Sequence, residues 1–134
     1  MLLNTDKNGN VKEAVLSDLD GLRTIGDKFD ILTRFYMPPE YNVGKDYEAS
    51  KEKDCYSCGV MFVQHLLGTE FADDKDYSQK NFQPEVLREN MEKIGITGKE
   101  QNKLLEILTG LLQPDREKRM SMKTALRLLK QINP

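Results

Sequence analysis

The chain has 134 residues, a length typical of one domain, and its 20 basic and 22 acidic side chains give a net charge of −2. This balance, without any basic cluster, argues against a nucleic acid or a membrane surface as partner. No apolar run approaches the roughly 20 residues of a membrane span, and two cysteines cannot build a disulfide framework, so we expect a cytoplasmic protein.

Residues 1–17 are predicted to form a β-hairpin. Apolar residues lie on both sides of Asn8-Gly9, a pair that tolerates the positive φ angles of a tight turn. The stretch from Asn4 to Val15 also matches a calcium-binding loop in part. However, Val15 occupies the last ligand position, where such a loop needs a bidentate glutamate, so the pattern favours a plain hairpin turn.

Helices are predicted for most of the chain after residue 50. Residues 51–67 are apolar nearly all round after the first turn, which is typical of a buried helix, and Gly68 can end it. By contrast, residues 21–44 show no steady period and contain two prolines, so we expect a long loop with a short helical turn at Pro39-Glu40.

Three further helices follow. Pro84 opens one that runs to residue 94, and Gly95 comes directly after it. Thr97 and Glu100 have the spacing of a capping box at the start of the next, which Pro114 ends. Ser121 is predicted to cap the last helix. The expected fold is therefore mainly α with one small hairpin.

Four short motifs occur in a characteristic order. They are Asp18-Leu19-Asp20-Gly21, Thr33-Arg34-Phe35-Tyr36-Met37-Pro38-Pro39-Glu40, Asp54-Cys55-Tyr56-Ser57-Cys58-Gly59-Val60 and Gln113-Pro114-Asp115-Arg116-Glu117-Lys118-Arg119. Together they resemble the helical C-terminal lobe of a eukaryotic-type protein kinase. The resemblance implies a partial kinase domain over residues 1–134, with a hairpin at 1–17, an activation segment at 18–40 and a helical subdomain at 51–134.

The resemblance assigns a role to several side chains. Asp18 stands at the Asp-Phe-Gly position and would bind Mg²⁺. Thr33 would shape substrate docking and indicates serine/threonine specificity, and Thr24 is a candidate phosphorylation site in the activation segment. The scaffold roles fall to Asp54, which would hold the catalytic loop, and to a buried ion pair between Glu40 and Arg119.

Several parts of a complete kinase have no counterpart in these residues. No glycine-rich loop, strand lysine or catalytic loop with its base is present, so no catalytic residue is assigned in this chain. Met1-Leu2-Leu3 resembles the strand that follows the catalytic loop. We therefore expect Mg²⁺ and ATP to act in the intact kinase without binding this fragment tightly. The expected partners are the kinase N-lobe and a protein substrate.

Two alternatives remain open. Asp20 replaces the glycine of the Asp-Phe-Gly motif, which favours a non-catalytic, pseudokinase-type interaction module. The same residues also resemble the Asp-x-Asp-Gly-Thr motif of haloacid-dehalogenase-type phosphatases, in which Asp18 would be the nucleophile. That fold needs a parallel sheet of alternating strands and helices, which the sequence after Gly21 does not suggest.

The remaining metal-type residues favour structural roles. Cys55 and Cys58 form a Cys-x-x-Cys pair, and His65 is the only histidine of the chain. A zinc site needs four ligands and a thioredoxin-like pair needs a βαβ unit, so we expect two core cysteines and a non-catalytic histidine.

Overall fold

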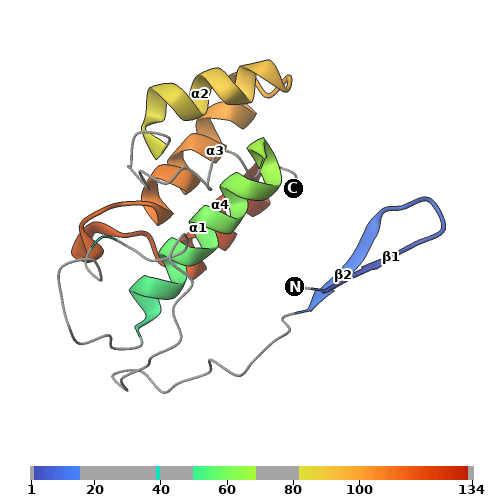
Figure 1. Ribbon diagram of the computed structural model, residues 1–134, viewed down its shortest axis with the longest axis horizontal. Helices are drawn as coiled ribbons and strands as arrows, with labels where there is room; N and C mark the ends of the chain where they lie inside the picture. Colours follow the sequence, from blue (N-terminus) through green and yellow to red (C-terminus); the bar gives the residue numbers. More distant parts are fainter. Residues whose placement is uncertain (1, 16–38, 40–49, 69–81, 133–134) are drawn as a thin grey trace.

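The computed structural model describes residues 2–15, 39, 50–68 and 82–132. Figure 1 shows the four described helices packed together and the N-terminal hairpin away from them. The strands and helices are β1 (Leu2–Thr5), β2 (Val11–Val15), α1 (Lys51–Leu67), α2 (Pro84–Lys93), α3 (Gly98–Leu111), the 3₁₀ turn η6 (Arg116–Lys118) and α4 (Met122–Ile132). This confirms the predicted mainly α fold with a small N-terminal hairpin.

The hairpin is antiparallel, and Lys7-Asn8-Gly9 form its turn between Asp6 and Asn10. Asp6 accepts from Gly9 N at 3.1 Å and donates its own N–H to Asn10 O at 2.9 Å, and Gly9 has a φ of 83°. A glycine in the left-handed region at the end of such a loop is the usual companion of a bulge at the strand start. A separate irregularity lies within the strands, since Thr5 pairs with Val11 and Asn4 with Glu13, which makes Lys12 the extra residue of a bulge.

α1 is the long helix of the body, and both of its predicted ends are confirmed. Ser50 caps its start, since the Ser50 hydroxyl accepts from Lys53 N at 3.1 Å. Gly68 ends it with φ 111° and ψ 156°, a combination that glycine alone adopts readily. Of its residues after Cys55, the part predicted to be buried, His65 is exposed and the others are buried or half-buried. None of the described helices is long and apolar enough to cross a membrane.

The loop between α2 and α3 is fixed by backbone bonds. Ile96 N donates to Met91 O at 2.9 Å and Gly95 N donates to Glu92 O at 3.1 Å, the two bonds of a Schellman motif around Gly95. The predicted capping box at the start of α3 is wrong, since the Thr97 side chain makes no capping bond. Gly98, the first residue of α3, has a φ of 65°, outside the helical region, so the chain enters the helix with a geometry that differs from the usual N-cap.

α3 lies at the centre of the helical core and contacts α1, α2 and α4. One face of α3 packs against α1 and α2, where the buried side chains are Tyr56, Val60, Val63, Phe82, Leu87, Met91, Leu104, Leu105, Leu108 and Leu112. The other face meets α4 and the first turns of α1 through Cys55, Ile107, Leu111, Ala125 and Leu128. Because both clusters include residues of α1, this helix is held from two sides near its N-terminus.

Candidate functional site

The first turn of α1 presents its charged side chains to solvent. Lys53 Nζ lies 3.9 Å from a carboxylate oxygen of Asp54, whose side chain is 78% exposed. Acidic side chains are favourable in a first helical turn because the backbone N–H groups there carry a partial positive charge. Asp54 therefore stands at the helix start with its carboxylate available at the surface.

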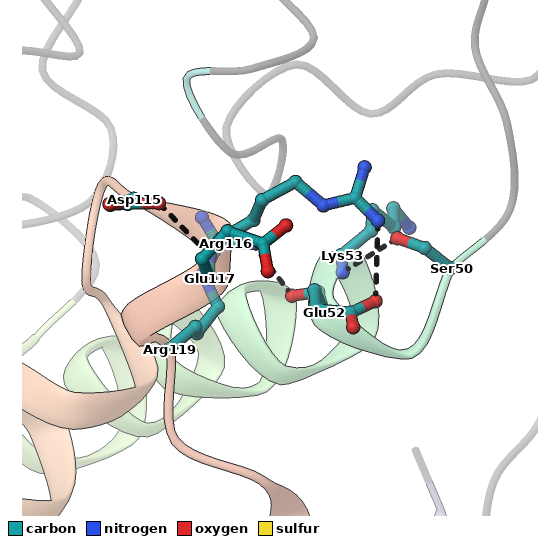
Figure 2. Close-up of polar contacts among 7 residues, drawn as sticks. All are labelled: Ser50, Glu52, Lys53, Asp115, Arg116, Glu117 and Arg119. Atoms are coloured by element: carbon teal, nitrogen blue, oxygen red, sulfur yellow. Dashed lines mark hydrogen bonds and ion pairs between the residues drawn. The ribbon is translucent and has the colours of Figure 1, made fainter.

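The turn after α3 lies against this same helix start (Figure 2). Asp115 forms its beginning, since one carboxylate oxygen accepts from Glu117 N at 3.0 Å. Arg116 then reaches the Glu52 carboxylate of α1 at 3.6 Å, with both side chains about half exposed. An ion pair this exposed contributes about 0–1 kcal/mol to stability. It therefore adds little to the attachment of the turn to α1.

Arg119 makes the deeper connection between the turn and α1. Its Nε donates to Gln113 O at 2.9 Å, and its two terminal nitrogens donate to Glu52 O at 2.9 Å and Pro114 O at 3.3 Å. The residue is 9% exposed, and its guanidinium lies over the Tyr56 ring at 5.1 Å from the ring centroid. A buried charge needs such partners because water no longer solvates it.

Several predicted site residues lie outside the described part of the chain. Asp18, Thr24, Thr33 and Glu40 are among them, and Pro39, the one described residue of its motif, lies in a 3₁₀ turn. The predicted ion pair between Glu40 and Arg119 therefore stays a prediction. Arg119, the described member of the pair, is buried between the turn and α1.

The contacts of Arg119 with α1 are the part of the site that sequence reasoning missed. The prediction paired this arginine with a distant carboxylate, whereas a backbone carbonyl of Glu52 and the ring of Tyr56 are its described partners on α1. Glu52 and Tyr56 are four residues apart and so share one face of the helix. Backbone acceptors leave no trace in side-chain patterns, so no sequence signal marked the Glu52 carbonyl as a partner of Arg119.

Cys55 lies in the core as expected, whereas Cys58 is only half-buried. Both are free thiols. Burial raises the pKa of the Cys55 thiol, against a smaller opposite effect of the Met122 backbone. Burial, followed by the neighbouring Cys55, raises the pKa of Cys58. His65 is exposed and its Nδ1 lies 2.8 Å from Met61 O. Within the described ranges no three His, Cys, Asp or Glu side chains gather where they could hold a metal ion.

One of three comparisons with known proteins identifies a family. The family model described as "Protein kinase domain" matches residues 21–128, more than half of the chain, and so includes α1 to α3 and most of α4. No curated protein and no solved structure matches the chain. The described sheet is a two-stranded antiparallel hairpin, so neither comparison nor fold supports the phosphatase alternative. The chain belongs to the protein kinase domain family.

Proposed function

We propose that this chain is the C-terminal lobe portion of an ATP-dependent serine/threonine protein kinase that, when intact, transfers the γ-phosphate of ATP to a protein hydroxyl. The observation that carries the proposal is the burial of Arg119 against the start of α1, inside a stretch that matches the kinase family. This contact unites the third and fourth kinase-like motifs, which are far apart in sequence. Burial of a charged side chain is costly unless it is paired or hydrogen-bonded, so the position of Arg119 is a specific structural feature.

The proposed roles follow the motifs. Asp18 binds the Mg²⁺ that accompanies ATP, Thr33 contributes to substrate docking, and Asp54, Glu40 and Arg119 hold the scaffold. Mg²⁺ supplies charge neutralisation for the phosphates when it is bound. In kinases such an ion is held by few carboxylates together with the phosphates. Asp18 is the one ligand assigned here, so we propose that the 134-residue chain binds Mg-ATP weakly and is inactive in isolation.

Calorimetry tests the weak binding directly. Titration of the purified chain with Mg-ATP is expected to give no micromolar affinity. If the coding sequence continues upstream of Met1, the longer product is expected to bind Mg-ATP and to phosphorylate serine and threonine peptides in preference to tyrosine peptides. In that product D18N removes most of the activity, while D20G, which restores the usual glycine, preserves or raises it. A longer product that binds ATP but phosphorylates none of these peptides contradicts the proposal.

A second candidate function is a non-catalytic, kinase-like interaction module. The observation that favours it is Asp20, a charged residue where the family has a flexible glycine. If this function is the correct one, the longer product binds no Mg-ATP and D20G does not restore binding. An active kinase would instead bind Mg-ATP and lose its activity through D18N, so these results distinguish the two functions.

Regulation and location complete the proposal. Phosphorylation of Thr24 would add charge to the activation segment and could order it through arginine contacts. Mass spectrometry of the protein purified from cells, with and without phosphatase treatment, tests this modification. We also propose a cytoplasmic location, supported by the two free thiols, which suit a reducing compartment. Fractionation of cells that express a tagged chain tests the location.

A further inference from the structure

We propose that the outer surface of α4 binds an acidic protein segment that carries apolar side chains. This surface, called here the α4 face, consists of Met122, Lys123, Leu126, Arg127 and Lys130. All five residues are exposed. The proposal does not depend on phosphoryl transfer, because it concerns a surface on the last helix of the lobe.

The α4 face contains a short apolar row. Met122 is 43% exposed and Leu126 is 54% exposed, and their spacing of four residues places them one above the other on the helix. Ala125 and Leu128 are buried on the opposite side and hold α4 on the core. α4 therefore does not need Met122 and Leu126 for its own packing, and they remain open to a partner. Methionine also adapts easily to different apolar surfaces.

A row of cations runs beside the apolar row. Lys123, Arg127 and Lys130 are spaced by four and three residues, and the sequence from Met122 to Ile132 contains no acidic residue. In the described part of the chain, none of these three cations lies within ion-pair distance of a carboxylate, whereas Lys53, Lys103 and Arg116 each do. Three unneutralised cations together on one face of a chain with a net charge of −2 form a local positive patch.

The two rows together specify the chemistry of the partner. Carboxylates complement the cations, and apolar side chains complement Met122 and Leu126, as in helix-in-groove and acidic-motif recognition. A second copy of this chain fits poorly, because a symmetric contact would bring the same positive faces together. A nucleic acid backbone would satisfy the cations but leave the apolar row uncovered. An acidic, amphipathic protein segment satisfies both rows.

Selection from a random peptide library on the immobilised full chain tests the proposal without assuming a partner sequence. We expect the enriched peptides to combine acidic with apolar residues and to bind more weakly as the salt concentration rises. L126D is expected to weaken binding of these peptides by about tenfold or more, since it places a charge at the centre of the contact. The triple variant K123Q/R127Q/K130Q is expected to weaken binding and to reduce its salt dependence.

Matched controls separate binding from folding. Ile94, the residue that ends α2, is 51% exposed, so I94D introduces the same kind of change at a comparable surface residue outside α4. K99Q removes an exposed cation outside α4. Both controls are expected to leave peptide binding unchanged, and circular dichroism checks that every variant is folded. The proposal is overturned if no peptide is enriched, if the enriched peptides lack an acidic bias, or if L126D binds them as well as the unaltered chain does.

Vesicles provide the alternative arm of the test. Phosphatidylcholine vesicles with added phosphatidylserine are sedimented with the full chain. Three surface cations give a weak attraction to such lipids, so we expect little co-sedimentation. Strong co-sedimentation that is lost in both L126D and the triple variant would show that the α4 face binds a membrane surface and not an acidic protein segment.

Discussion

The guanidinium of Arg119 lies over the ring of Tyr56, with its Cζ atom 5.1 Å from the ring centroid. Tyr56 is fully buried in the first half of α1, and Arg119 follows the η6 turn. The stacking and the carbonyl bonds to Gln113, Pro114 and Glu52 fix one arginine between two segments that are distant in sequence. This contact fixes the start of α1, where the Asp54 side chain is exposed.

Replacement of Arg119 tests how much this contact stabilises the lobe. R119M keeps much of the side-chain volume but leaves three carbonyl oxygens without their donor. Loss of such bonds at a buried position is expected to lower the free energy of unfolding by about 2–4 kcal/mol. Urea unfolding followed by circular dichroism measures the change.

Arg116 supplies the matched control. R116M removes an arginine three residues away whose ion pair with Glu52 is about half exposed, so we expect a change within about 0.5 kcal/mol. Equal changes in the free energy of unfolding for R116M and R119M would show that the buried contacts of Arg119 stabilise the lobe no more than the exposed ion pair of Arg116.

The sequence predicted the ends of several elements well. Local signals were reliable: Gly9 closes the hairpin, and Pro84 and Gly95 mark the two ends of α2. Each of these residues acts through its own backbone, so its effect depends little on the rest of the fold. The capping box at Thr97 failed because it needed a specific geometry that the positive φ of Gly98 prevents.

Long-range contacts were harder to predict, for a physical reason. Arg119 was recognised as an anchor through its motif, yet its described partners are mostly backbone carbonyls, which every residue carries. A sequence pattern shows which side chain needs acceptors but not which carbonyls will supply them. The packing of α3 between α1 and α4 likewise follows from shape complementarity that the apolar rows suggest only in part.

A close backbone approach gives a second stability test. A Cβ atom added at Gly110 would lie 2.9 Å from Met120 Cβ and 2.6 Å from Met120 Cε. The segments cannot separate easily, because Met120 N donates to Gly110 O at 2.8 Å. G110A is therefore expected to be destabilising, since overpacking of about 1–3 kcal/mol outweighs a gain in helix propensity of about 1 kcal/mol.

A double-mutant cycle separates these two effects. In the M120A background the Met120 Cε contact is gone, so G110A is expected to cost less than it does alone. Denaturant unfolding of the four proteins gives the coupling energy. A cycle with no coupling, or a stabilising single G110A variant, would show that the lobe tolerates the extra methyl group at this crossing.

The two thiols are expected to react slowly in the folded chain. Burial raises the pKa of both Cys55 and Cys58, so little of the reactive thiolate is present near neutral pH. Iodoacetamide should modify the native chain roughly tenfold or more slowly than the urea-unfolded chain, because burial limits both ionisation and access. Mass spectrometry of C55S and C58S reports each remaining thiol separately. We expect half-buried Cys58 to react before buried Cys55. Rapid modification of both native thiols would contradict their placement in the core.

The hairpin loop gives a prediction about pH. The backbone N–H of Asn10, and then that of Asn8, hold the pKa of the Asp6 carboxyl below its ordinary value. The folded loop thus favours the ionised carboxylate. Its contribution is complete above the ordinary aspartate pKa of about 3.9 and is lost as the pH falls through the lowered value.

An NMR titration of the Asp6 carboxyl checks this sign. Its midpoint should lie below the ordinary aspartate pKa of about 3.9. D6A removes the carboxylate oxygen Oδ1, which accepts from both Asn8 N and Asn10 N. It should therefore broaden or shift the amide signals of Asn8 and Asn10 at neutral pH. D6N retains an acceptor oxygen and should preserve the loop without the pH dependence, because its side chain does not titrate. If D6N lost the loop as fully as D6A does, the negative charge rather than the hydrogen-bond geometry would be what shapes this turn.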